Sequence, residues 1–390
     1  MITVDAIVAG AGPAGSALAA HLSRAGASVL LVEAAEHPRP KACAEYASPR
    51  IVEELARLGL ASSWADDAVP LRCMDLHAGG RIAPIRYADA RGPRPAWGVD
   101  RRTFDARLAR HAVECGAELR GRTRLGGLVV EGGRVRGARL RDVATGTQTE
   151  VRAGWTIGAD GTRSTVSRLL GVERPVRFPR RLGLIAHYAG IAELADHGEM
   201  HVGDDGYVGL APTPGGELNV GMALPLDGGG TSAEARFAQA IGALPAVARR
   251  LAGSRRLTPI RGAAPIGHRV SRTAGPGWLL VGDAAGFVDP FTGEGIFRAL
   301  RSARAAADAI RAGGDVSAAY QRERRRAFAA KDALTWLVQG FLAAPPLLEH
   351  AVGRLAERPG AALRLGSVLG DCRPATDALA PRALLELMAP

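Results

Sequence analysis

The chain opens with apolar runs and helical spacings that predict a strand, a helix and a second strand. Residues 3–9 form an apolar run typical of a buried strand. Leu18 and Leu22 lie four positions apart and indicate one face of a helix. A second apolar run, 28–32, ends at Glu33. This order is that of a compact βαβ unit.

Helical and strand patterns continue along the rest of the chain. Helical spacing predicts five further segments, at 52–60, 103–115, 233–241, 296–311 and, as a tail, 320–390. Apolar runs predict strands at 155–159, 182–188, 199–210, 217–224 and 277–281. Residues 128–141 carry Gly132-Gly133 between two alternating runs, which indicates a hairpin. Between about 177 and 257 the pattern is typical of a mostly antiparallel sheet.

Composition changes this picture little. The 390 residues include 50 Lys and Arg, and the formal net charge is +11. The arginines are scattered, and no basic run is interleaved with aromatic residues, so we expect no nucleic-acid partner. We attribute the basic balance to a general bias toward Ala, Gly, Arg and Pro. Only Lys41 and Lys331 are lysines, which draws attention to both.

Cysteine usage and hydropathy favour a cytoplasmic location. The four cysteines lie far apart and lack metal-ligand spacing, so we expect a reducing compartment and no metal site. The N-terminal run has no positive start and no cleavage site, so we expect no signal peptide. The best apolar stretch, 333–344, is too short to span a bilayer, so membrane contact is at most peripheral.

A glycine-rich turn joins the first predicted strand to the first helix. Gly10, Gly12 and Gly15 have the spacing in which one glycine permits a tight turn, one admits a pyrophosphate and one allows close helix–strand contact. The helix start around Ala14 offers free N–H groups to phosphates. Glu33 follows Gly15 by 18 residues, where it can hydrogen-bond an adenosine ribose. These residues predict a dinucleotide site without separating FAD from NAD.

Two later segments, each after a short predicted strand, make the pattern specific. Asp160-Gly161 lies in 158–164, and Asp283 lies in 282–286. With the glycine turn, they resemble the GxGxxG, DG and GD motifs of FAD-dependent class A monooxygenases of the p-hydroxybenzoate hydroxylase fold. That superfamily also contains geranylgeranyl reductases and flavin-dependent halogenases. The resemblance covers most of residues 1–310.

The resemblance implies an α/β fold with a GR2-type Rossmann-like FAD-binding domain, an inserted, mostly antiparallel substrate sheet and a helical C-terminal tail. We expect a discontinuous FAD domain over 1–70, 99–176 and 275–330. The substrate domain would comprise 71–98 and 177–274. The tail, 331–390, would cap the substrate cavity, touch a membrane surface or pack on the core.

The resemblance also implies roles for single residues along the FAD. Asp283 would hydrogen-bond the ribityl chain, Asp160 and Gly161 would lie near the pyrophosphate, and Arg101 would lie beside the FAD chain. A loop over 289–295 opens the long helix, whose N-terminus would stabilise negative charge on the pyrimidine side of reduced flavin. The loop residues included in this site are Pro290, Gly293, Glu294 and Gly295.

A second loop, 39–45, is similar to the Lys-x-Cys-Gly stretch of the reductase branch, with Ala44 in place of the last glycine. Lys41 would steady a phosphate or the flavin, or be a surface lysine. Cys43 would approach the flavin or be a small apolar filler. In the predicted substrate sheet, Gly209 and Ala223 stand where prenyl reductases carry a tryptophan and a glycine.

The leading functional prediction is an FAD-dependent monooxygenase of secondary metabolism. It would hydroxylate or epoxidise an apolar or aromatic small molecule through a flavin C4a-hydroperoxide, with electrons from NAD(P)H. A base that ionises a phenol would help. The candidate catalytic residues are His187, His201, Tyr207 and Tyr46, with Glu45 as a weaker candidate.

Other functions stay open. One alternative is an FAD-dependent reductase or dehydrogenase of isoprenoid or polyene double bonds, and others are a halogenase or a flavin-binding accessory protein. No second GxGxxG follows a strand, so NAD(P)H would visit transiently or a separate electron donor would act. The sequence leaves the oligomeric state undetermined.

Overall fold

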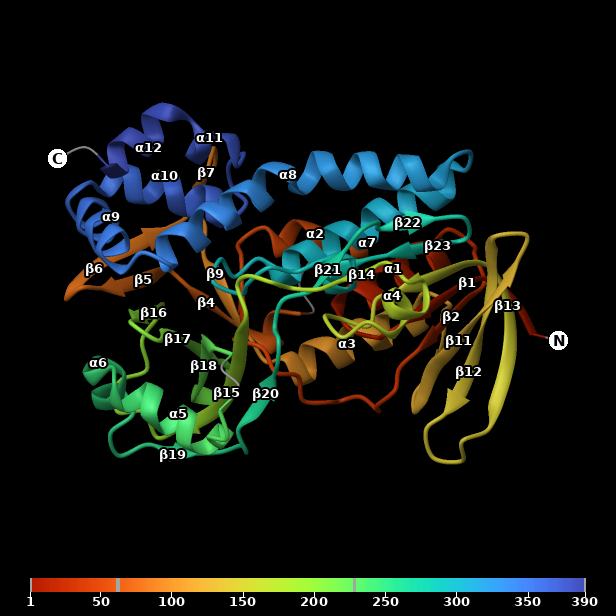
Figure 1. The fold of residues 1–390 in the computed structure, drawn as a ribbon, viewed down its shortest axis with the longest axis horizontal. Helices are drawn as coiled ribbons and strands as arrows, with labels where there is room; N and C mark the ends of the chain where they lie inside the picture. The colour runs from red at the N-terminus through yellow and green to blue at the C-terminus, as the bar shows by residue number, and fades with distance from the viewer. Residues whose placement is uncertain (1, 61–63, 227–228, 389–390) are drawn as a thin grey trace.

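The computed structural model of this chain describes residues 2–60, 64–226 and 229–388. It has two large sheets at opposite ends of the molecule, with helices between and above them (Figure 1). The first sheet has the order β10 (Glu118–Arg120), β2 (Val29–Val32), β1 (Ile2–Ala9), β13 (Gln148–Gly158), β12 (Arg134–Asp142) and β11 (Thr123–Glu131).

Strand β13 joins two kinds of pairing in this first sheet. Its first half pairs antiparallel with β12, and its second half pairs parallel with β23 (Trp278–Leu280), which also contacts β22 (Ala274–Gly275). From Val151 to Gly158, β13 also runs parallel to β1. The expected strand at 155–159 is therefore too short. The first half of β13 mixes exposed and buried residues, so a search for apolar runs does not detect it.

The parallel strands are covered by a different layer on each face. Ala6 and Val8 of β1 pack with the helices, whereas Ile7 and Ala9 pack with β11, β12 and α4 (Thr165–Leu169). This alternation follows from the two-residue period of a strand. The helices of the first layer are α1 (Pro13–Arg24), α2 (Ile51–Leu58), α3 (Arg101–Glu114) and α7 (Gly295–Ala312).

The second sheet contains β19 (Arg255–Arg256), β15 (Arg181–Ala189), β18 (Glu217–Pro225), β17 (Gly206–Thr213), β16 (Gly198–Gly203), β5 (Cys73–Ala78) and β6 (Arg81–Arg86), with β20 (Arg261–Ala263) also paired to β15. Its neighbours run antiparallel, except for the parallel pair β16 and β5. The single strand expected over 199–210 is wrong, because Asp204 and Asp205 form a turn between β16 and β17.

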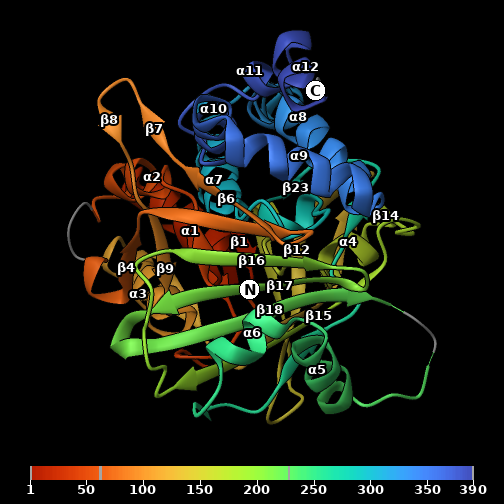
Figure 2. The same cartoon turned by 90° about the vertical axis from the view of Figure 1, so that its left-hand side faces the viewer.

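The two faces of the second sheet meet different partners. Helices α5 (Ala233–Gly242) and α6 (Pro245–Arg250) cover the face that carries Leu184, Val208 and Val220 (Figure 2). The opposite face carries His187, Tyr207 and Asn219, and Asn219 donates a hydrogen bond to the Cys43 carbonyl oxygen at 3.0 Å. Short strands link the two halves. They are β3 (Tyr46–Ala47), β4 (Ala68–Leu71), β7 (Ala88–Asp89), β8 (Gly92–Pro93), β9 (Ala96–Val99), β14 (Glu173–Arg174) and β21 (Arg269–Val270).

The C-terminal part is helical, as expected, although residues 389–390 lie outside the described residues. Helix α8 (Val316–Leu342) crosses the top of the molecule in Figure 1, and the four helices that follow gather beside β5 and β6. They are α9 (Pro345–Glu357), α10 (Pro359–Leu369), α11 (Thr376–Leu379) and α12 (Pro381–Met388). Leu348 and Val352 pack with Leu76 and Ile85 of the sheet. Among the described helices, none is long and apolar enough to cross a membrane.

Candidate functional site

The glycine turn after β1 has a geometry that only glycine permits at two of its positions. Gly10 has a φ of +104°, and an added Cβ would lie 2.5 Å from the Ala159 carbonyl oxygen. A Cβ on Gly15 would lie 1.8 Å from the Gly10 carbonyl oxygen. Gly12 caps α1 without a side-chain hydrogen bond, so no side chain covers the N–H groups around Ala14. The start of α1 is therefore available to an anion.

Glu33 lies beside this turn at the end of β2. Its Oε2 accepts a hydrogen bond from the Ala11 N–H at 3.0 Å and faces Arg39 Nη2 at 3.2 Å. Arg39 Nη2 would also lie 3.6 Å from a Cβ on Gly12. The carboxylate expected to bind a ribose is thus fixed next to the glycine turn.

Asp160 lies across the same turn and caps α4. Its Oδ2 accepts hydrogen bonds from the Thr165 N–H at 2.7 Å and the Val166 N–H at 3.2 Å. Its Oδ1 is buried and has no hydrogen-bond partner within the described part of the chain. Burial raises the pKa of Asp160 above its ordinary value. The free oxygen is one sign that this region is suited to a polar ligand.

Asp283 follows β23 and faces two cations from distant segments. Burial raises the pKa of Asp283, against the opposing charges of Lys41 and Arg101. Burial lowers the pKa of Lys41, whose Nζ would lie 3.4 Å from a Cβ on Gly161. Arg101 binds Asp105 through two hydrogen bonds of 2.7 and 2.8 Å. The structure therefore brings Lys41, Asp160, Gly161, Asp283 and Arg101 together beside the glycine turn, and we name this set of residues the candidate cofactor groove.

The loop 289–295 continues from this groove to the start of α7. Gly293 has a φ of +69°, and a Cβ there would lie 2.7 Å from Tyr46 Cδ1. A Cβ on Gly295 would meet nothing within 4 Å, so open space lies before the helix. Pro290 and Gly295 flank this turn, and Glu294 occupies the cap position without capping α7 by a side-chain hydrogen bond.

Glu294 belongs to a buried charge cluster that the sequence did not reveal. Lys331 Nζ lies 2.9 Å from Glu294 Oε1 and 3.0 Å from Asp371 Oδ1, and it donates to the Val368 carbonyl oxygen at 2.7 Å. Burial raises the pKa of Glu294 to about 7, against the effect of Lys331. The scarcity of lysine was the only signal available for Lys331.

His187 is part of a buried hydrogen-bond network between the second sheet and the loop 39–45. His187 Nε2 lies 2.7 Å from Glu45 Oε2, which also accepts from Asn219 Nδ2 at 3.0 Å. Glu45 Oε1 accepts from the Arg101 N–H at 3.0 Å. Burial alone would lower the pKa of His187, but the hydrogen bond with Glu45 raises it overall. Glu45 has a φ of +56°, uncommon for a residue with a side chain.

The two candidate tyrosines lie at the contact between the loop 289–295 and the second sheet. Tyr46 and Tyr87 share a hydroxyl–hydroxyl hydrogen bond, and burial raises the pKa of Tyr46 well above its ordinary value. Tyr207 donates to Asp289 Oδ1 at 2.6 Å, and burial together with Asp289 raises its pKa well above its ordinary value. Both tyrosines stay protonated at neutral pH, so neither is placed to act as a base.

His201 lies on the other face of the second sheet. It pairs in register with Val208, on the side covered by α5 and α6, whereas His187 pairs with Asn219 on the opposite side. Its Nε2 lies 2.8 Å from Glu199 Oε2. The structure therefore separates His201 from the other candidates, and its placement does not support a role as catalytic base.

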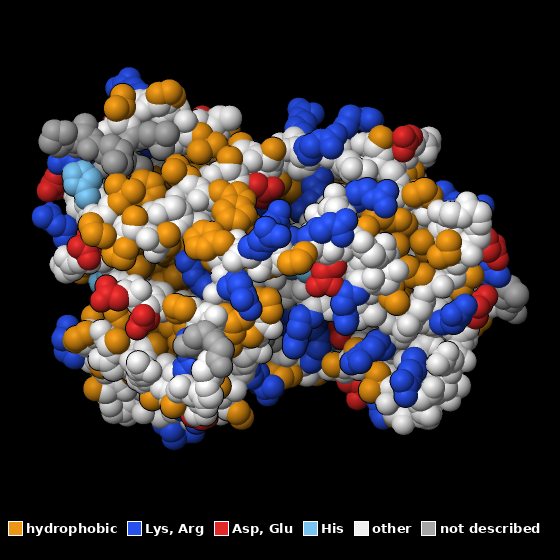
Figure 3. All heavy atoms as spheres, viewed as in Figure 1, with side chains coloured by type: hydrophobic (Ala, Val, Ile, Leu, Met, Phe, Trp, Pro, Cys, Tyr) orange, Lys and Arg blue, Asp and Glu red, His pale blue; other side chains and the backbone are white. Residues whose placement is uncertain are grey.

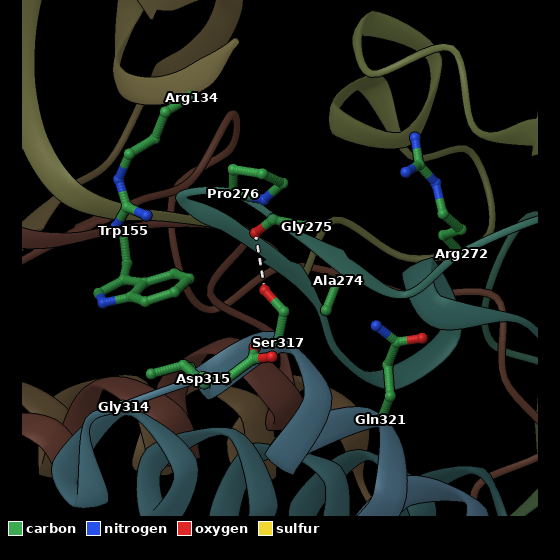
Figure 4. A pocket seen from close by; sticks show the side chains of 11 residues that line it. Arg134, Trp155, Arg272, Ala274, Gly275, Pro276, Gly314, Asp315, Ser317 and Gln321 are labelled. Carbon is green, nitrogen blue, oxygen red and sulfur yellow. Dashed lines mark hydrogen bonds between the residues drawn. The ribbon is translucent and has the colours of Figure 1, made fainter. Parts of the chain in front are cut away.

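Two cavities lie near these elements. One of about 220 Å³ borders the loop 289–295 and is lined by Asp289, Glu294, Gly295, Arg298 and Trp336, among others. The other, of about 410 Å³, lies between the β22–β23 turn and the start of α8, where Ser317 Oγ donates to the Gly275 carbonyl oxygen at 3.0 Å (Figure 4). None of the predicted site residues lines this second cavity. Figure 3 shows Lys and Arg side chains spread over one face, with hydrophobic patches between them.

The groove fits an extended dinucleotide that carries a flavin. Its features are the uncapped start of α1, the unpartnered Asp160 oxygen, the buried Asp283 and the open space before Gly295. This fold and site define an FAD-dependent oxidoreductase. The chain belongs to the FAD binding domain family, whose model matches residues 3–331, within the p-hydroxybenzoate hydroxylase-like superfamily.

Named relatives support the same family. The chain is 33% identical over 329 residues to a menaquinone reductase of Mycolicibacterium smegmatis, covering 81% of this chain and 79% of the relative. It is 32% identical over 340 residues to a digeranylgeranylglycerophospholipid reductase of Methanosarcina mazei, covering 80% and 77%.

Solved structures share the fold. A geranylgeranyl bacteriochlorophyll reductase-like protein of Thermoplasma acidophilum matches with a TM-score of 0.82 and 24% identity, over 100% of this chain and 99% of that one. A flavin-dependent brominase matches with a TM-score of 0.83 and 22% identity, over 98% of each chain. The expected α/β fold with a helical C-terminal region is confirmed.

Proposed function

We propose that this chain is an FAD-dependent reductase that adds hydrogen to a double bond of an apolar, isoprenoid-type substrate. Two reductases stand among its relatives, and the name of one of them specifies a geranylgeranyl lipid. The sequence alone ranked monooxygenation above double-bond reduction, and this proposal reverses that ranking.

The observation that carries the proposal is a continuous apolar layer beside the loop 289–295. It begins at Phe291, which contacts the Tyr207 ring edge-to-face at 5.1 Å, and continues through Met200 of the second sheet. It ends at Leu348 and Val352 of α9. A long hydrocarbon chain needs such a layer, because each buried methylene group contributes about 0.8 kcal/mol.

Residues of the groove would hold the cofactor. The start of α1 would bind the pyrophosphate, Glu33 the adenosine ribose and Asp283 the ribityl chain, while the start of α7 at Gly295 would face the pyrimidine ring. When bound and reduced by an electron donor, the flavin would supply the hydride. The apolar layer around Phe291 would exclude water from the substrate and orient its double bond.

A reduction of this kind also needs a proton, and two groups stand at the contact between the loops and the second sheet. The Tyr46 hydroxyl carries a proton, and it shares a hydrogen bond with the Tyr87 hydroxyl. The two hydroxyl groups form a short hydrogen-bonded relay. His187 shares its proton with Glu45. We favour Tyr46 as the donor, because it contacts Gly293 of the loop 289–295, whereas the Nε2 atom of His187 is engaged by Glu45.

The reductant would approach through the cavity of about 220 Å³ beside the loop 289–295. Arg269, Arg298 and Arg324 line it, and Trp336 offers a half-exposed ring. Guanidinium groups and an aromatic face suit a nicotinamide dinucleotide. A separate electron donor is the alternative. The four cysteines are unpaired in the structure, which is consistent with the proposed cytoplasmic location.

Monooxygenation is the second candidate, and Gly209 favours it. Gly209 carries no aromatic ring where prenyl reductases carry a tryptophan, and the flexible Met200 side chain lies 3.5 Å from where a Cβ at this position would be. Movement of Met200 would admit an aromatic or fused-ring substrate.

The deciding experiment is mass spectrometry of products formed by the FAD-loaded protein. The chain would be incubated with prenylated quinones, geranylgeranyl lipids and phenolic polyketides, with NADH, NADPH or dithionite, in the presence and absence of oxygen. A gain of two hydrogens without oxygen supports the reductase, and a gain of one oxygen atom supports the monooxygenase. Bound FAD with no turnover of any substrate would favour an accessory protein.

A further inference from the structure

A second group of chemically active side chains lies on the face of the second sheet that is opposite to the loop 289–295. His77 comes from β5, and Glu199 and His201 come from β16. Strands β5 and β16 run parallel, with His77 directly opposite His201. One ligand atom from each of the three residues lies within 4.8 Å of the other two.

The three side chains are oriented by their neighbours. The His77 and His201 rings stack with centroids 4.0 Å apart and planes inclined by 24°. Glu199 Oε2 faces His201 Nε2 at 2.8 Å, while its Oε1 accepts from Arg250 Nη2 of α6 at 2.6 Å. Within the described residues, the His77 ring has no hydrogen bond. Glu199 and His201 are buried and His77 is half-buried, which leaves an approach on the His77 side.

We propose that His77, Glu199 and His201 form a binding site for a divalent transition-metal cation, with Zn²⁺ as the best match. Two imidazoles and one carboxylate form a set that Zn²⁺ prefers, at about 2.0–2.2 Å from each ligand atom. In a tetrahedral site, such ligand atoms lie roughly 3.4 Å apart. The present atoms lie within 4.8 Å of one another, so binding would require the stacked His77 and His201 rings to rotate toward the ion. A water molecule would complete the coordination.

The cation would have a structural role. The site is separated from the flavin groove by the sheet itself, since His187 and Asn219 lie on the opposite face. It joins β5 to β16, the parallel pair that connects the early segment 71–98 to the later strands. Because its ligands come from segments more than a hundred residues apart, the cation would stabilise the sheet by holding this pair together.

Arg250 has two effects on the site. Its hydrogen bond fixes the Glu199 carboxylate, as partners of metal ligands commonly do. Its positive charge also opposes the cation and lowers the affinity. Direct titration is therefore a better readout than metal content after purification.

The test uses the FAD-loaded full chain, freed of metal by dialysis against a chelator and titrated with Zn²⁺ by calorimetry and by competition with a chromophoric chelator. We expect about one Zn²⁺ per chain, a higher melting temperature with Zn²⁺, and an absorption spectrum of tetrahedral Co²⁺ when Co²⁺ replaces it. His77→Ala and His201→Ala should each abolish binding and the thermal shift, with unchanged FAD content.

The control is His350→Ala, which removes an exposed histidine of α9 and should bind Zn²⁺ like the wild type. If His201→Ala fails to fold, Glu199→Gln keeps the shape of the side chain and should still weaken binding at least tenfold. Wild-type protein without saturable Zn²⁺ binding would overturn the proposal. So would equal binding by His77→Ala and wild type, because the three residues would then be only a hydrogen-bonded cluster.

Discussion

The buried cation Lys331 offers the sharpest test of how the C-terminal helices support the loop 289–295. Its Nζ lies 2.9 Å from Glu294 and 3.0 Å from Asp371, and the three side chains are 8%, 3% and 6% exposed. Lys331→Met keeps the length and apolar stem of the side chain but removes the charge. Both carboxyl groups then lose their shared cation, and of the described cations only Arg298, at 3.7 Å from Glu294 Oε2, still faces Glu294.

The expected loss follows from this burial. Removing one partner of a buried ion pair costs about 3–5 kcal/mol, because the remaining charge stays buried. The pKa of Glu294 is about 7, well above its ordinary value of 4.5, so the folded state holds this proton more tightly than the unfolded state. Stability from this group is therefore present at low pH and is lost as pH rises toward 7 and beyond. Without Lys331 the pKa of Glu294 rises further, and the destabilisation should be about 1 kcal/mol larger at pH 8 than at pH 6.

Urea unfolding of the FAD-free proteins at both pH values measures this loss. The matched control is Arg354→Met, which breaks an exposed ion pair with Glu357 at 2.8 Å and should cost about 0–1 kcal/mol. Adding Glu294→Gln to Lys331→Met should remove the extra pH dependence. A loss for Lys331→Met no larger than that of the control would refute the reasoning, as would a pH dependence that persists in the double variant.

Three further predictions concern the cofactor, the histidine and the tail. Asp283→Ala should lose FAD, measured by the yellow absorption of the purified protein and the flavin released on denaturation; a normal flavin content would contradict our assignment of this carboxylate. Glu45→Gln should lower the pKa of His187, because the charged partner that raises it is gone, and NMR titration of the imidazole resonances measures the change; an unchanged pKa would show that Glu45 is not its cause. Ending the chain at Ala344 removes α9 to α12 and uncovers the apolar side of β5 and β6, so we expect aggregation, measured by size-exclusion chromatography; a soluble, monodisperse product would show that the sheet does not need this cover.

The residues that sequence predicted best are those whose backbone geometry admits few alternatives. Gly10 and Gly15 are fixed by contacts that no side chain permits, so their spacing carried the information. The long helices and two strands of the second sheet, β15 and β18, were also predicted, because their apolar patterns extend over many residues. Strands β4 and β9 have four residues each and are interrupted by Pro70 and Gly98, so they show neither a period nor an unbroken apolar run.

The parts that sequence missed depend on tertiary placement. His187 and His201 both lie in strands, and only the pairing of those strands decides which face each one occupies, since a shift by one residue reverses it. Lys331, Glu294 and Asp371 meet although 77 residues separate the last two. No local pattern connects such positions.

The order of strands in the second sheet has a consequence for synthesis on the ribosome. Strand β5 ends at Ala78 and pairs at once with β6, but its other neighbour β16 starts only at Gly198, so one edge of β5 stays unpaired while the intervening segment is made. Asp283 emerges later still, after the whole sheet. Cofactor loading is therefore a late event, and the apolar side of β5 and β6 stays uncovered for longer still, until α9 has been made.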